Sequence, residues 1–490
     1  MSFALTLLIL LLTGCLAISA HSQPSWKNYP FDLEPGHPEA ELMFPGAEAN
    51  HPNDMSDSWF VTGTLQGQTT GREYQFVSIF DRNDITAVIL DFYQVSLFDL
   101  GTGTYGTFTD YDLPVIDILD QRLHYSNDYL NLGFDSSAGH ATWANVLNAT
   151  GLPTPFVYNV HLPGVDSQSN KPFSIDLTID MQNEPVPFGA DVLRGIFTFY
   201  AQKGTHTYFQ TGPKMNGTVT FLDGTTEKVQ GTKGHIDRQW FPLYSGIFTP
   251  TGRQHSHEWR QINFDNGEDF SIWRQFDRVN NNTVIEDTGA TNYDPTGSPT
   301  YVPDDLQVEY RSYAKYPRSR FSTLIPPPSQ NMYLPSSHIL TSKTLGMNLS
   351  VNYVQPIPAV TLPIEYFEGP ATYVGTLHGQ PASGTGIFES TLALYRDWEL
   401  VDVLSNSVAH LPPSSFSPSG PGASALGQLV DGAKAYVSSS PLKDNRVAAK
   451  AYLESKVRPA LGTLVNAQDK ATMLEILDDL EASFALVLQF

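Results

Sequence analysis

The stretch GTKGHIDRQWFP, residues 231–242, groups side chains that could do chemistry: Asp237, Arg238, Gln239 and Trp240. A buried carboxyl whose pKa is raised can act as a general acid, and an indole face can stabilise a cation. Successive side chains of a strand point to opposite faces, so Arg238 need not hold Asp237 ionised. Two interpretations follow: Asp237 is a catalytic acid with Arg238 and Trp240 against the substrate, or Asp237 and Arg238 form a structural ion pair.

A second group of candidates lies in HSHEWRQINFDNGEDFSIWRQF, residues 255–276. The Asn-Gly pair at 266–267 predicts a two-residue hairpin turn, which would pair Trp259 with Arg274. Strand alternation then places His257, Trp259 and Arg274 on one face. This mixture of apolar and polar groups predicts the wall of a ligand cavity. A surface cation–π latch between Trp259 and Arg274 is the equally weighted alternative.

Metal and cofactor signals are weak. His255 and His257 alternate on one strand, but two ligands do not make a zinc site and no third is placed by the sequence. GTGTYG, residues 101–106, fits the dinucleotide fingerprint, yet no helix pattern follows it. Glu368 could reach a ligand from the second barrel, or its aromatic neighbours could simply fill the core. We therefore expect no metal and no cofactor.

The composition favours a hydrophobic small-molecule partner. The chain has 51 acidic and 28 basic residues, a formal net charge of −23, and no block of Lys or Arg. These features argue against nucleic acid or an anionic membrane surface as a partner. A neutral or cationic ligand is expected to bind more readily than an anion. The oligomeric state is left open.

The elements that must position these residues are mostly strands. Between about residues 55 and 400, short aromatic and β-branched runs alternate with turn signals, whereas apolar residues from Met473 to Phe484 recur at helical spacing. The predicted fold is mainly β, with two tandem lipocalin-like antiparallel β-barrels and a small C-terminal helical appendage. The expected units are an N-terminal barrel over 21–245, a C-terminal barrel over 246–405, a Pro/Ser/Gly-rich linker over 406–425 and a helical tail over 426–490.

The first twenty residues predict a secretory signal peptide. The apolar run from Ala4 to Leu12 is too short to span a bilayer, so we expect a secreted protein without a stable membrane span. A lipoprotein anchor at Cys15, the only cysteine, is the minority alternative. Cleavage beyond Cys15 would leave no thiol or disulfide chemistry. Sequons for N-glycosylation occur at Asn148, Asn216, Asn281 and Asn348.

Three segments carry a family resemblance: SDSWFVTGTLQG…GREYQFVSIFDR, GTVTFLDGTTEKVQGTKGHIDRQW and IEYFEGPATYVGTLHGQPASGTGIFESTLAL. In order and spacing the chain resembles the AttH-like and carotenoid 1,2-hydratase-like proteins over roughly residues 40–400, with kievitone hydratase as the nearest named activity. The resemblance implies tandem lipocalin-like barrels that hold an isoprenoid or polyketide in or between them. Some members hydrate a trisubstituted alkene, and related fungal proteins are pericyclases.

The resemblance also bears on the site. The hydratase pattern at Asp237 usually reads Asp-His-Glu-Trp or similar, whereas this chain reads Asp-Arg-Gln-Trp. The acid and the indole are thus retained. We expect a secreted enzyme acting on a prenylated, terpenoid or polyketide molecule, by hydration of an alkene or a related isomerisation or cyclisation. A non-catalytic carrier or scavenger of an apolar ligand is the alternative, and carbohydrate binding is a weaker third.

Overall fold

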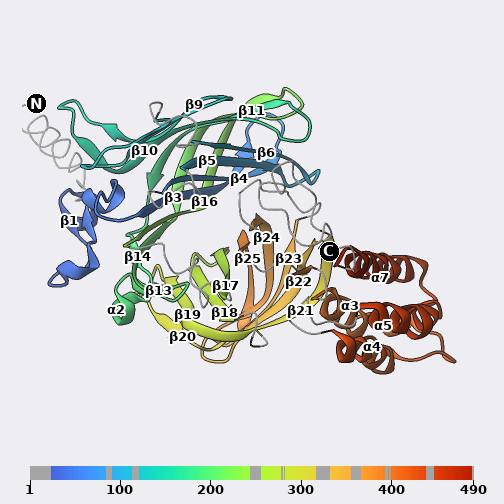
Figure 1. Cartoon of the computed structure of the whole chain (residues 1–490). Coiled ribbons are helices and arrows are strands. Elements are labelled where there is room, and N and C mark those ends of the chain that lie inside the picture. Colours follow the sequence, from blue (N-terminus) through green and yellow to red (C-terminus); the bar gives the residue numbers. More distant parts are fainter. Residues whose placement is uncertain are drawn as a thin grey trace, which may run out of the picture.

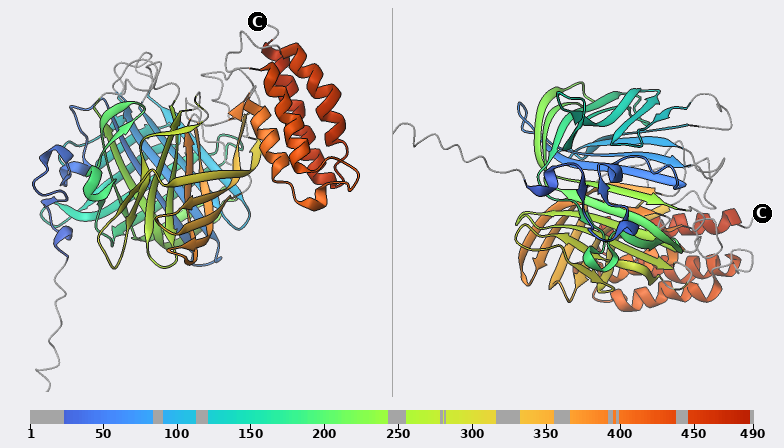
Figure 2. Two further views of the ribbon diagram at one scale, coloured as in Figure 1. Left: turned by 90° about the horizontal axis from the view of Figure 1, so that it is seen from below. Right: turned by 90° about the vertical axis from the view of Figure 1, so that its left-hand side faces the viewer.

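The computed structural model describes residues 24–83, 91–112, 121–242, 255–277, 280, 282–315, 332–354, 366–391, 395–396, 399–437 and 446–487. The expected signal peptide, Cys15 and Asn281 lie outside these residues. Two curled antiparallel sheets lie one above the other, and a group of helices stands beside the second sheet (Figures 1 and 2). The mainly β class with two tandem sheets and a C-terminal helical appendage is confirmed.

Within the described residues the first sheet has 14 strands, and its main path runs β6-β5-β4-β3-β16-β15-β11-β10-β9-β8-β7, with β14 also paired to β16. The sheet is curled, and its two edge strands are not hydrogen-bonded to each other in the described part of the chain. It is therefore a half-barrel. The strands are β3 (Ser56–Gly67), β4 (Glu73–Asn83), β5 (Phe92–Asp99), β6 (Thr104–Tyr111), β7 (Leu123–His124), β8 (Asn131–Ser136), β9 (Gly139–Leu147), β10 (Pro153–Val165), β11 (Pro172–Met181), β12 (Val186–Pro187), β13 (Ile196–Phe199), β14 (Gln202–Thr211), β15 (Pro213–Thr220) and β16 (Thr226–Phe241).

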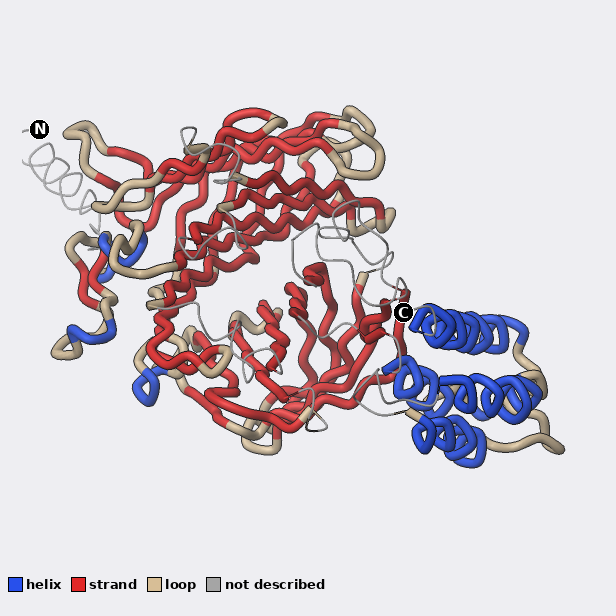
Figure 3. Tube along the Cα trace, in the orientation of Figure 1, coloured by secondary structure: helices blue, strands red, loops and turns tan. Residues whose placement is uncertain are grey.

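The second sheet, as far as the structure describes it, has 10 strands in the order β20-β19-β18-β17-β25-β24-β23-β22-β21, with β26 paired to β22. It too is curled and antiparallel (Figure 3). The strands are β17 (His255–Phe264), β18 (Asp269–Asp277), β19 (Thr283–Tyr293), β20 (Tyr301–Pro303), β21 (Leu306–Lys315), β22 (Met332–Ser342), β23 (Met347–Tyr353), β24 (Tyr366–Leu377), β25 (Gln380–Thr391) and β26 (Tyr395–Arg396). A small separate pair, β1 (Phe31–Asp32) and β2 (Met43–Phe44), precedes the first sheet.

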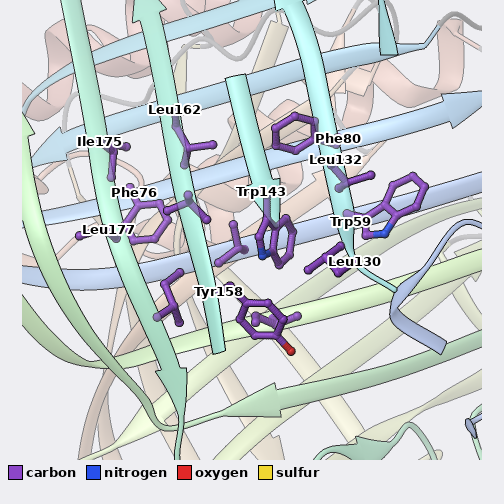
Figure 4. Close-up of a cluster of buried hydrophobic side chains, with 14 of the residues drawn as sticks. Trp59, Phe76, Phe80, Leu130, Leu132, Trp143, Tyr158, Leu162, Ile175 and Leu177 are labelled. Carbon is purple, nitrogen blue, oxygen red and sulfur yellow. The ribbon is translucent and has the colours of Figure 1, made fainter. Parts of the chain in front are cut away.

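The central strands of each sheet are buried on both faces. On β3, Trp59 and Val61 belong to the core of the first half-barrel, whereas Phe60 belongs to a separate cluster between the sheets. Figure 4 shows Trp59 in the first core with Trp143 and Tyr158. The near-continuous burial of the central strands explains why their sequences are rich in aromatic residues on both faces.

The C-terminal helices pack around their own apolar core, against the edge of the second sheet. Tyr333 of β22 donates a hydrogen bond to Asp479 of α7 at 2.6 Å. The helical spacing seen in the sequence is confirmed, and none of the described helices is long and apolar enough to cross a membrane. The helices are α2 (Ala190–Leu193), which lies in the first sheet region, and α3 (Leu400–Ala409), α4 (Ala423–Asp431), α5 (Arg446–Tyr452), α6 (Arg458–Leu461) and α7 (Ala467–Val487).

Helix α3 begins before the linker that the sequence predicts at 406–425. Leu400, Val403 and Leu404 recur at helical spacing and are fully buried in the core of the helices. The Pro/Ser/Gly-rich composition signals the loop after this helix but gives no information about the helix itself.

Residues 24–50 contribute to the core of the first half-barrel, and Glu48 anchors them there. Its carboxyl group is 1% exposed and accepts hydrogen bonds from the hydroxyls of Tyr29, at 3.0 Å, and Tyr158. No cation forms an ion pair with it among the described residues. Burial raises the pKa of Glu48 to about 7.

A second anchor is made by Arg238 of β16. Its guanidinium group donates to Asp57 Oδ1 at 2.8 Å, to the carbonyl oxygen of Ala49 at 2.8 Å and to that of Ser58. It also lies over the ring of Trp59, at 4.2 Å from the centroid. Arg238 is 1% exposed. Its buried ion pair joins β16 to β3, and its hydrogen bond to the Ala49 carbonyl ties residues 24–50 to the first sheet.

We predict that Arg238→Met lowers the free energy of unfolding by about 3–5 kcal/mol, because it leaves the Asp57 carboxylate buried without its cation. Urea unfolding followed by tryptophan fluorescence measures this. Asp237→Asn, at the next position on the opposite face, is the matched control and should change stability far less. Arg238→Lys should lie between them, since it keeps the charge and loses the planar fork. Equal losses for Arg238→Met and Asp237→Asn would contradict the anchor.

We predict a pH-dependent stability contribution from Glu48. Its folded-state pKa lies above its ordinary value, so the folded protein binds this proton more tightly than the unfolded chain does. The stabilising contribution of the Glu48 proton is fully present below about pH 4.5 and is lost as the pH rises to about 7. The free energy of unfolding of Glu48→Gln, relative to that of the wild type, should therefore rise by roughly 3 kcal/mol between pH 4.5 and pH 8. A stability difference that does not change with pH would refute this.

Candidate functional site

The two sheets meet through faces turned away from their own cores. The contact is an aromatic cluster in which β3, β4, β5, β13 and β16 of the first sheet face β17, β18, β24 and β25 of the second. Its buried members are Phe60, Val77, Ile79, Phe92, Phe98, Tyr111, Phe188, Phe197, Phe199, Tyr200, Phe241, Trp259, Trp273, Tyr366 and Ile387. We call this the inter-sheet cluster.

Asp237 lies at this contact, on β16, and is 3% exposed. Its Oδ1 accepts a hydrogen bond from the Gln239 amide at 3.1 Å, and its Oδ2 has no hydrogen-bond partner among the described residues. The Nε2 atom of His235 lies 3.7 Å from Oδ2. Burial raises the pKa of Asp237, and the charge of Glu389 on the second sheet adds to this effect. Burial also lowers the pKa of His235. Both shifts act in the direction of the uncharged forms of the two groups.

The second sheet presents a hydrogen-bonded chain to the same region. The Glu389 carboxylate bonds to His257 Nε2 at 2.6 Å and accepts from the Tyr366 hydroxyl at 2.9 Å. The other ring nitrogen of His257, Nδ1, bonds to the Tyr200 hydroxyl at 2.9 Å. His257 is thus held in orientation on both sides, as a residue that handles protons needs to be.

Glu368 stands directly across from Glu389 in the β24–β25 ladder. It is 1% exposed, and neither of its carboxyl oxygens has a hydrogen-bond partner within the described part of the chain. Burial raises the pKa of Glu368 well above its ordinary value, and the neighbouring charge of Glu389 raises it further. Ionising both of two adjacent buried carboxyls costs free energy, because their negative charges repel, so the protonated form of Glu368 is favoured.

Aromatic rings of the inter-sheet cluster pack near these acids. Trp259 packs edge-on against Phe60 at 5.1 Å and against His235 at 5.3 Å between ring centroids. Its indole nitrogen donates to Ser271 at 3.0 Å, which fixes the ring. Trp273 lies 6.2 Å from Trp259. Such faces stabilise positive charge that develops beside them.

Arg238 and Trp240, expected at the substrate, point away from this site. Both belong to the opposite face of β16, inside the first half-barrel, as the alternation of a strand requires. Trp240 is stacked between the rings of His51, at 4.0 Å, and His206, at 5.3 Å. The DRQW stretch is therefore a structural anchor on one face and a candidate site on the other. The ion pair expected between Asp237 and Arg238 does not form. Arg238 forms an ion pair with Asp57 instead.

Arg274 is also separated from the site, because the hairpin register predicted from the sequence is wrong by one residue. The turn is a three-residue loop closed by a hydrogen bond from Gly267 N to Phe264 O, with Gly267 at φ +87°. Trp259 therefore pairs with Trp273, and Arg274 pairs with Glu258 on the other face. The expected latch between Trp259 and Arg274 does not form.

The structure brings Asp237, His257, Trp259 and Glu368 together. His255, the other half of the possible metal pair, instead lies 2.8 Å from Glu286. No group of three or more potential metal ligands occurs among the described residues.

Sequence reasoning missed His235 and Glu389. His235 could have been found, since it lies two positions before Asp237 and hence on the same face of a strand. Glu389 is 132 residues from its partner His257, and nothing in its local sequence signals the contact.

Comparisons with known proteins find solved structures of similar fold. No family model and no curated protein matches the sequence. A protein assigned as AttH from Nitrosomonas europaea superposes with a TM-score of 0.50 at 17% identity, covering 74% of this chain and 98% of that one. Kievitone hydratase from Nectria haematococca superposes with a TM-score of 0.51 at 17% identity, covering 71% of this chain and 92% of that one. The chain shares the two-sheet fold of these proteins, which confirms the resemblance seen in the sequence at the level of the fold.

Proposed function

We propose that the protein is an enzyme that binds a hydrophobic small molecule between its two sheets and protonates it at a carbon–carbon double bond. The observation that carries this proposal is Asp237: a buried carboxyl with a raised pKa, one unpartnered oxygen and aromatic rings around it. The fold shared with kievitone hydratase supports the same class of reaction.

In this mechanism the Asp237 carboxyl gives its proton to one alkene carbon, and the other carbon becomes a carbocation. The faces of Trp259 and Phe60 stabilise the cation. Water then forms the new C–O bond and returns a proton to the Asp237 carboxylate, so the enzyme is regenerated and the product gains one water. If another double bond of the substrate attacks the cation instead, loss of a proton to the same carboxylate gives a cyclised or isomerised product.

We predict that Asp237→Asn lowers kcat at least 100-fold, because general acid catalysis contributes roughly 10²–10⁴. Kievitone and other prenylated phenols are suitable first substrates, with incorporation of ¹⁸O from labelled water measured by mass spectrometry. Asp223→Asn, which removes an exposed carboxyl, is the matched control and should keep full activity. Loss of activity in Glu368→Gln with full activity in Asp237→Asn would transfer the role of the acid to Glu368.

A carrier without catalysis is the second candidate, favoured by the Arg and Gln that follow Asp237 in place of titratable residues. A pericyclase, which positions a substrate and needs no proton, would also survive Asp237→Asn. Native mass spectrometry of the protein from its own medium, followed by extraction and long incubation of the ligand with the protein, distinguishes a carrier from an enzyme. A carrier returns its ligand unchanged, whereas an enzyme yields a product.

We also propose that the protein is secreted and glycosylated. Its first twenty residues support secretion, and Asn148, Asn216 and Asn348 are exposed, as acceptors must be. We expect the protein in the medium of a eukaryotic host, with a mass that falls when a glycosidase removes N-glycans. Retention in the cells, or an unchanged mass, would refute the respective half of this proposal.

A further inference from the structure

A second polar network lies inside the second half-barrel, on the face of β17 opposite Trp259. It is built from Glu258 and Arg260 of β17 and Arg274 of β18, all at most 7% exposed. Their neighbours Ile262 and Ile272 belong to the core of this half-barrel. The network is thus separate from the inter-sheet cluster and independent of the proposed activity.

The Glu258 carboxylate is already shared among three donors. Its Oε2 accepts from Arg260 Nη2 at 3.0 Å and from Arg274 Nη1 at 3.4 Å, and its Oε1 accepts from the Tyr310 hydroxyl. Because both guanidinium groups bond to the same oxygen, they lie next to each other with a single carboxylate between them.

His338, the other titratable neighbour, brings no compensating charge. Arg260 Nε donates to His338 Nε2 at 3.1 Å, so this nitrogen must offer a lone pair. The ring hydrogen is then on Nδ1, which bonds to the Tyr353 hydroxyl at 2.9 Å. The imidazole is therefore neutral, and burial together with the two arginines lowers its pKa well below the ordinary value.

The network therefore holds two positive charges and one negative charge. No other carboxylate forms an ion pair with Arg260 or Arg274 in the part of the chain that the structure describes. Among the described residues, three donors on this face also have no hydrogen-bond partner: Arg260 Nη1, Arg274 Nε and Ser390 Oγ. Ser390 lies directly across from Glu258 in the β17–β25 ladder. A buried uncompensated charge is strongly destabilising, so a site of this kind favours an anion.

The surroundings indicate which anion. Arg274 lies over the ring of Phe276 at 4.7 Å and Arg260 over that of Phe388 at 4.8 Å, so the charged groups are bordered by aromatic surface. Arg274 and Tyr310 retain some exposure, which gives the network a contact with solvent. We propose that this network binds the carboxylate of a hydrophobic monocarboxylic acid. The net charge of −23 disfavours anions over the surface as a whole, but Debye screening confines that repulsion to about 10 Å while the arginines act at contact.

Sodium benzoate is the probe, and the full-length protein is titrated in a buffer of low anion content. We expect a saturable rise in Tm with benzoate and none with benzamide, which has the same ring and no charge. Arg274→Met should weaken the apparent affinity at least ten-fold. Arg311→Met removes an exposed arginine paired with Glu309 and is the matched control, with an unchanged titration.

Ser390→Ala keeps the test decisive if Arg274→Met does not fold, and it should weaken benzoate binding several-fold. Equal benzoate titrations for the wild type and the foldable site variants would overturn the site. An equal response to benzamide would show that only the apolar surface is occupied. Chloride or phosphate acting as strongly as benzoate would overturn the carboxylate assignment.

Discussion

The central strands of this protein are buried on both faces, and this constraint governs the chemistry of the whole molecule. Every residue of β17 and of β18 is buried, although both strands carry acids, arginines and amides. A charged side chain there cannot turn towards water, so it must either meet an opposite charge or remain neutral. Glu258 meets two arginines inside the second half-barrel, whereas burial raises the pKa values of Asp237 and Glu368 between the sheets.

The contrast is clearest between two acids. Burial alone would raise the pKa of Glu258, but Arg260 and Arg274 lower it below its ordinary value. No guanidinium forms an ion pair with Asp237 in the described part of the chain, and the pKa of Asp237 is raised. Two buried acids thus have pKa values shifted in opposite directions, Glu258 downward by its arginines and Asp237 upward by burial. The outcome depends on the charged groups that each side chain meets on its own face of the strand.

The sequence predicts this alternation but not the partners. Strand periodicity was enough to place Asp237 and Arg238 on opposite faces, and the Asn-Gly pair at 266–267 was enough to predict a hairpin there. The register failed because an Asn-Gly pair fits both a two-residue turn and a three-residue loop whose last residue is left-handed, and only the pairing decides. The contact of His257 with Glu389 joins strands distant in sequence, and no local pattern encodes it.

Geometry also clarifies the departure from the hydratase pattern at Asp237. A histidine at the position of Arg238 would point into the first half-barrel if β16 kept its course, so its replacement removes no titratable group from the face of Asp237. That face keeps an imidazole through His235, two residues earlier. The replacement at Gln239 is different, because its amide donates directly to Asp237 Oδ1 and leaves Oδ2 for a proton. The altered block is therefore compatible with an acid at Asp237 that works beside an amide instead of a second carboxylate.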